Sequence, residues 1–162
     1  MKYQEVLSEI TKRTQGREKG PLVLTHQTVT RQVREGLCPV PDRTYNKGER
    51  GKSSEYAEST PAFIFAAHSM MFGRPRYPLD HVVETIKKLR QAGPYPKGVF
   101  VVDRGGLGVS DDVVSGWGQE SADRDRYLNY FLGYFETMDD ENEIAAAGNR
   151  AISDVWSREW AK

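Results

Sequence analysis

A short helix with a fixed start and a fixed end is the feature that most constrains the fold of this chain. Thr25 can cap its first turn, because a hydroxyl can accept a hydrogen bond from a first-turn N–H group. Val29 and Val33 stand four residues apart and so share one face of the helix. Gly36 occupies the position at which a left-handed residue ends a helix. Two prolines follow, and they cannot continue the helix because proline lacks an N–H group.

The predicted helix covers residues 25–35. Its face without the valines is polar and cationic. Hydrogen-bonding side chains suit the edges of bases, and cationic side chains suit phosphates. We therefore expect the helix to enter the major groove of DNA, with Gln27, Thr30 and Arg31 near bases. Arg34 would hold the phosphate backbone. The candidate DNA-contacting residues of the helix are His26, Gln27, Thr30, Arg31 and Arg34.

A basic segment, residues 43–56, follows the prolines. Its cations stand around Asn46, Gly48 and Gly51, which are residue types found in turns between short strands. We expect a hairpin whose cations reach the flanking backbone or the minor groove. A helix for the groove followed by a basic hairpin is a winged helix-turn-helix arrangement. The candidate DNA-contacting residues of the hairpin are Arg43, Lys47, Arg50 and Lys52.

The two segments share a longer pattern, T-V-x-R-x-x-R-E-G-L-x-P-x-P-x-R-T, which runs from Thr28 to Thr44. It resembles the recognition helix and the start of the wing in MerR-like regulators, and residues 54–56 resemble the end of that wing. Residues 77–84 are similar to the start of the next helix of the family. The resemblance covers roughly residues 22–91. It implies a winged helix-turn-helix domain that binds DNA in transcriptional control, usually as a dimer.

Three features depart from the family pattern. Residues 15–21 read as a loop between the first two helices, where family members usually have a tight turn. Arg31 and Gln32 stand where the family has paired aromatic residues. No long heptad helix follows the DNA-binding part, so the family's antiparallel dimer coil is not evident in the sequence. These departures concern the oligomeric state and any effector more than DNA binding.

The two halves of the chain carry opposite charge, although the total is zero. Residues 1–97 hold 17 Lys and Arg against 10 Asp and Glu, a net charge of +7. Residues 98–162 hold 6 against 13, a net charge of −7. Positive charge on the predicted helix and hairpin is typical of a protein in which one part meets a polyanion. A chance distribution of surface charge is the alternative.

The sequence also argues against several classes of protein. It has no run of about 18 apolar residues, so it predicts no membrane span. Its first ten residues, MKYQEVLSEI, lack the pattern of a signal peptide, and we expect a cytoplasmic protein. Cys38 is the only cysteine, which excludes an internal disulfide and a Cys-rich zinc site. We expect Cys38 to be a small buried residue.

Apolar spacing predicts further elements on both sides of this region. Residues 22–24 could be a short strand or a hydrophobic lead-in to the second helix. The predicted fold is mainly α with small β-hairpins: a winged helix-turn-helix domain over residues 1–92, then a small acidic α+β part over residues 98–162 that ends in an αα-hairpin. The other predicted helices cover 2–13, 59–72, 79–90, 122–138 and 142–161, and a second hairpin pairs strands near 99–102 and 107–109.

A broad apolar stripe lies on the helix predicted over residues 122–138. Such a stripe could be part of the core, or it could form a dimer surface or a small-molecule pocket. The sequence alone leaves these alternatives open. The stripe consists of Tyr127, Tyr130, Phe131, Tyr134, Phe135 and Met138.

The predicted function is a sequence-specific DNA-binding regulator of transcription. Its partners would be double-stranded DNA and a second copy of the chain, with a possible small-molecule effector. No metal or cofactor is expected, because His26, His68 and His81 are scattered and form no ligand motif. One alternative is a protein–protein adaptor, such as a phage or plasmid accessory factor that reuses the winged fold. The other is a small enzyme with its site in the C-terminal half.

Overall fold

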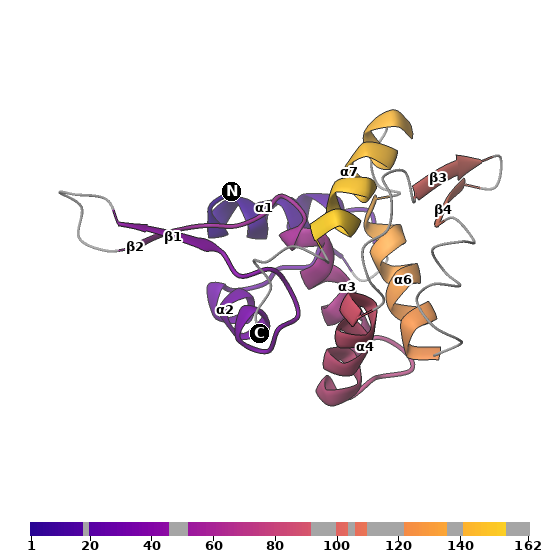
Figure 1. Cartoon of the computed structure of the whole chain (residues 1–162), viewed down its shortest axis with the longest axis horizontal. Helices are drawn as coiled ribbons and strands as arrows, with labels where there is room; N and C mark the ends of the chain where they lie inside the picture. The colour runs from indigo at the N-terminus through magenta and orange to yellow at the C-terminus, as the bar shows by residue number, and fades with distance from the viewer. Residues whose placement is uncertain are drawn as a thin grey trace.

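Helices make up most of the described chain, and two small antiparallel hairpins accompany them (Figure 1). The computed structural model describes residues 1–17, 20–45, 52–91, 100–103, 106–109, 122–135 and 141–154. In chain order the elements are α1 (Tyr3–Arg13), α2 (His26–Arg34), β1 (Asp42–Tyr45), β2 (Lys52–Glu55), α3 (Thr60–Phe72), α4 (Leu79–Gln91), β3 (Phe100–Asp103), β4 (Gly106–Val109), α6 (Ala122–Phe135) and α7 (Glu141–Asp154). The mainly helical character that the sequence predicts is therefore confirmed.

The central element is α3, which begins with a proline in its first turn. Nine of its thirteen residues are buried, so it has no continuous face toward solvent. It packs against α1, α4 and α6 (Figure 1). Phe63 of α3 lies beside Phe131 of α6, with 5.1 Å between the ring centroids. Phe65 and Tyr134 make a second contact of this kind, at 5.6 Å.

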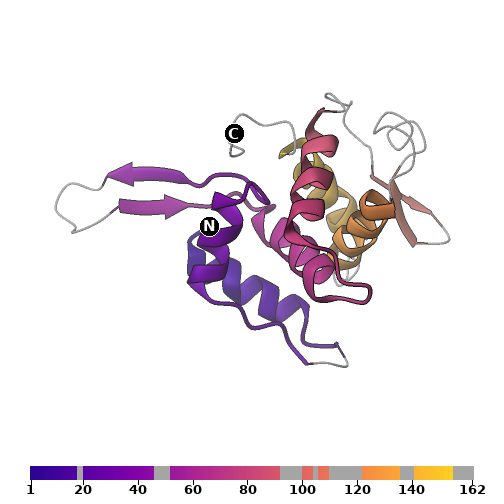
Figure 2. The same ribbon diagram turned by 90° about the horizontal axis from the view of Figure 1, so that it is seen from below.

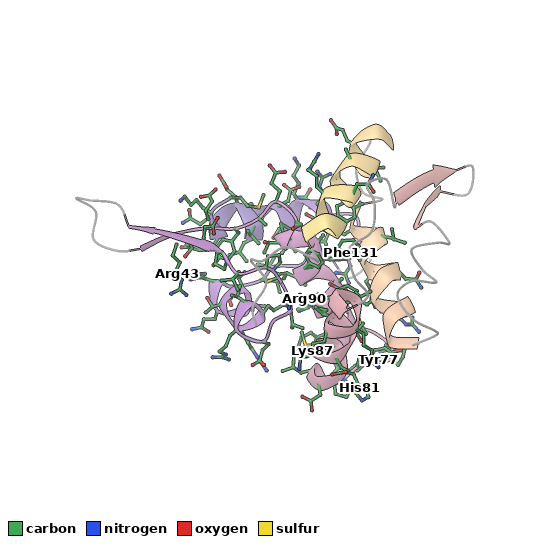
Figure 3. The ribbon with its side chains drawn as sticks, in the orientation of Figure 1. Arg43, Tyr77, His81, Lys87, Arg90 and Phe131 are labelled. Atoms are coloured by element: carbon green, nitrogen blue, oxygen red, sulfur yellow. The ribbon has the colours of Figure 1, made fainter. Side chains whose placement is uncertain are left out.

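The aromatic stripe of α6 belongs to the core. Tyr127, Phe131, Tyr134 and Phe135 are each at most 4% exposed, and Phe131 lies in the interior of the molecule (Figure 3). Their rings contact one another and the rings of α3. Among the alternatives that the sequence left open, the structure therefore favours core packing for these four residues. Met138 lies outside the described residues.

The core is continuous between the first four helices and the last two. Ala151 of α7 is fully buried in the same cluster as the buried residues of α1, α3 and α4. α7 contacts α6, as expected for consecutive antiparallel helices, and it also contacts β3. The predicted boundary between residues 92 and 98 falls outside the described residues and stays a prediction. The same holds for the end of the last helix beyond Asp154.

The N-terminus is bound to the end of the first hairpin. The Met1 ammonium group donates to the Tyr56 carbonyl oxygen at 2.7 Å and lies 2.7 Å from the Glu55 carboxylate. The ammonium group of Lys2 lies 3.0 Å from the same carboxylate. Hydrogen bonds from the N-terminus and then from Lys2 lower the pKa of Glu55. These contacts hold the start of α1 against the base of β2.

The segment before α2 is an extended lead-in and not a strand. The Leu22 N–H donates to the Thr14 hydroxyl at 2.7 Å, and the Thr11 hydroxyl donates to the Leu22 carbonyl at 3.0 Å. Both threonines belong to the C-terminal end of α1. This end therefore satisfies the backbone of residue 22 without any strand partner, which settles the alternative that the sequence left open.

Gly73 at the end of α3 is a site where a side chain would not fit. A Cβ atom there would collide with the Ser69 carbonyl oxygen and the Tyr130 hydroxyl. We expect Gly73→Ala to lower the free energy of unfolding by about 1–3 kcal/mol, because a backbone oxygen cannot move aside easily. Urea denaturation followed by circular dichroism measures this change.

Gly16→Ala is the matched control, because a Cβ atom at Gly16 meets nothing within 4 Å. We expect this variant to stay within about 1 kcal/mol of the natural protein. Equal stability of the two variants would contradict the close packing of α3 against α6 at this point.

Candidate nucleic-acid interface

Both ends of α2 are capped as the sequence predicts. The Thr25 hydroxyl accepts a hydrogen bond from the Thr28 N–H at 3.4 Å. At the other end Gly36 has φ +78°, and its N–H donates to the Val33 carbonyl. The Leu37 N–H donates to the Gln32 carbonyl at 2.9 Å, which completes a Schellman motif. The bounds of this helix therefore follow from local hydrogen bonds.

The polar face of α2 points to solvent. All five candidate DNA-contacting residues of this helix are exposed. Gln27, Thr30, Arg31 and Arg34 are separated by three or four residues, so their side chains form one stripe along the helix. The structure therefore brings them together on a surface that a ligand can reach.

The opposite face of α2 departs in part from the prediction. Val29 is fully buried, as expected, but Val33 is only partly buried. Gln32 takes the second inward position and is 2% exposed. Residues 29 and 32 are three apart and therefore share a face, so helical spacing alone allows this outcome. The sequence did not predict burial of Gln32, because an amide on the inward face departs from the pattern of apolar residues.

His26 has a neighbour that the sequence did not indicate. Its ring stacks on the ring of Tyr3 from α1, with 4.1 Å between the centroids and 26° between the planes. This contact joins the first turn of α2 to the first turn of α1. His26 remains exposed, and the stack limits the directions in which its ring can point.

The basic hairpin extends from the body of the molecule at the end where α2 lies (Figures 1 and 2). Asp42 of β1 pairs with Glu55 of β2, and Arg43 pairs with Ser54. The Arg43 side chain is exposed and extends on the α2 side of the hairpin (Figure 3). Lys52 lies in β2, as predicted. The tip, with Lys47 and Arg50, lies outside the described residues.

Two carboxylates near this surface, those of Glu35 and Glu55, lie beside cations. The N-terminus and Lys2 both contact the carboxylate of Glu55. The Glu35 carboxylate lies 3.8 Å from the Arg34 guanidinium. Because both side chains are in contact with solvent, this ion pair contributes little to stability. Within the residues that the structure describes, Arg31 and Arg43 form no ion pair. These two cations are therefore available to an anionic partner.

Two further properties of the described residues bear on the kind of site. Across the described ranges, no three His, Cys, Asp or Glu side chains converge in a way that could hold a metal ion. In the same ranges, no helix combines the length and the apolar composition needed to cross a bilayer.

Comparisons with known proteins found no matching family model, no matching curated protein and no matching solved structure.

Cys38 lies in the chain between α2 and the hairpin. It is fully buried, as predicted, and burial raises the pKa of its thiol from 9.0 to about 12. We expect the native thiol to react slowly with a disulfide reagent at pH 8, because the thiolate is the reactive form. Absorbance of the released chromophore measures the rate, and protein unfolded in guanidinium is the control.

The same shift predicts a pH dependence of stability. The unfolded thiol loses its proton near pH 9 and the folded thiol only near pH 12. The contribution of Cys38 to the free energy of unfolding should therefore be constant below pH 9 and decrease between pH 9 and pH 12.

In the thiol-reactivity experiment, equal reaction rates for the native and the unfolded protein would contradict the buried position of this side chain.

Proposed function

We propose that this chain is a winged helix-turn-helix protein that binds duplex DNA sequence-specifically and regulates transcription. The observation that carries the proposal is that the exposed cationic face of α2 and the basic hairpin lie at one end of the molecule. Val29 of α2 and Tyr56 at the end of the hairpin belong to the same core as α3, α4, α6 and α7, while the cationic face of α2 stays exposed.

The dimensions of α2 suit the major groove. Nine residues at 1.5 Å per residue give a helix of about 13 Å. The groove is about 12 Å wide and admits a helix. The polar stripe can then face base edges along most of its length, with the buried face directed toward the protein.

The proposed roles follow from side-chain chemistry. Gln27, Thr30 and Arg31 approach bases, where an amide suits adenine and a guanidinium suits guanine. Arg34, Arg43 and the wing residues contact phosphates, which fixes the register of α2 without reading sequence. The wing residues in this role are Lys47, Arg50 and Lys52.

A homodimer is the proposed functional form. One module of this size covers about 600–1,000 Å² of protein surface on DNA, which limits affinity. Two copies on a two-fold site would place two α2 helices in successive major grooves, about 34 Å apart. The C-terminal part, which carries the negative charge, would stay away from the phosphates and supply the contact between copies.

The salt dependence of binding tests this proposal. Five phosphate contacts in one module predict a log–log slope of about −4.5, which is an affinity loss of roughly 500-fold between about 50 and 200 mM salt. Arg43→Ala should make the slope less steep by about 0.9, because one fewer counterion is released. Fluorescence anisotropy of a labelled random-sequence duplex, titrated with the full chain, measures both quantities.

Arg150→Ala is the control, because Arg150 is an exposed cation of α7 that pairs with Glu58 and belongs to neither α2 nor the β1–β2 hairpin. It should leave the slope unchanged. Absence of binding at the lowest salt would refute the DNA-binding proposal. Tight complexes with another protein together with no DNA affinity would favour the adaptor alternative.

A further inference from the structure

A small cavity lies between α2, the C-terminal half of α3 and the start of α4. Its volume is about 200 Å³. Liquid water occupies about 30 Å³ per molecule, so this space equals roughly seven waters. A ligand here must therefore be small, of the size of a single substituted ring.

Gln32 is among the residues that line this cavity, and its amide is buried without a hydrogen-bond partner among the described residues. The side chain is 2% exposed, and neither its Nε2 nor its Oε1 atom makes a hydrogen bond in the described part of the chain. Buried polar groups in proteins are nearly always satisfied, and an exception requires an explanation. A ligand with matching groups is one such explanation.

The rest of the lining suits a flat and largely apolar molecule. Leu37, Met71 and Leu79 supply apolar surface. His68 and Phe72 line the cavity as a pair, with 4.6 Å between their ring centroids. Rings in such a pair can pack against another planar group.

The charges around the cavity favour a neutral ligand. Arg31 and Glu35 both line it, so the charged side chains of its lining sum to zero. Burial, and secondarily the positive charge of Arg17, lowers the pKa of His68, which favours the neutral imidazole. A neutral imidazole offers one donor and one acceptor, which adds to the hydrogen-bonding groups of Gln32.

We propose that this cavity binds a small neutral planar molecule with an adjacent hydrogen-bond donor and acceptor, and that the Gln32 amide, which is closed to solvent in the ligand-free chain, turns to meet that edge. A primary amide, a lactam or a nucleobase edge has this chemistry, because a side-chain amide pairs with it through two hydrogen bonds in one plane. The chain would bind this ligand without DNA. The proposal can therefore be tested independently of DNA binding.

Side-chain amide signals of the ¹⁵N-labelled full chain test the proposal directly. Titration with 2-pyridone and with nicotinamide should shift the Gln32 Nε2 signal in a saturable way. Toluene, which has the ring but no polar edge, should bind at least about tenfold more weakly, because the amide stays unpaired. Lack of a saturable shift with either amide-bearing probe would overturn the proposal.

Gln32→Leu gives the second readout. Removal of the unpaired amide should raise the Tm of the ligand-free protein by roughly 2–4 °C and weaken probe binding at least about tenfold. Gln4→Leu is the matched control, because Gln4 is an exposed glutamine of α1, and it should keep full binding. Unchanged binding in Gln32→Leu would overturn the assignment. If that variant does not fold, the titration of the natural chain decides.

Discussion

Burial of α3 is the constraint on which the rest of the structure depends. This helix is apolar on nearly every side, so it cannot remain in water and must be covered by several partners at once. Helices α1, α4 and α6 cover it, and the rings of Phe63 and Phe131 meet in the middle. Full burial of one such side chain contributes roughly 1.5–3 kcal/mol to folding. The α3–α6 contact therefore joins parts of the chain that are some sixty residues apart.

The proposed interface is an extension of this core. Val29, Leu37 and Cys38 are all at most 1% exposed and hold α2 and the first residues of the hairpin to the scaffold. The N-terminus secures the other strand of the hairpin through Tyr56 and Glu55. As a result, the exposed side of α2 needs no role in folding and can be polar and cationic. Arg31 belongs both to this surface and to the lining of the cavity beside Gln32.

Local structure could be predicted from the sequence because local rules determine it. Thr25 and Gly36 cap α2 through hydrogen bonds between residues at most five apart in the sequence. The strands β1 and β2 pair within the segment where the sequence predicts a hairpin. Burial of the aromatic residues of α6 could be anticipated only as one of several alternatives, because a stripe does not reveal its partner. The structure provides that partner, which is α3.

The features that the sequence did not reveal depend on contacts between distant residues. The stack of Tyr3 on His26 and the ion pair of the N-terminus with Glu55 join residues that no spacing rule relates. Burial of Gln32 was missed because a polar side chain on an inward face violates the usual pattern of hydrophobicity. The cavity beside it is formed by three separate elements and leaves no signature in any one of them.

Hydrogen–deuterium exchange of the full chain, with and without duplex DNA at low salt, tests the central claim most directly. Peptides that cover α2 and the β1–β2 hairpin should exchange more slowly in the complex, because their backbone faces the duplex. Peptides of α3, which is already buried, should not change. Protection confined to α6 and α7, or no protection anywhere on addition of DNA, would contradict the account.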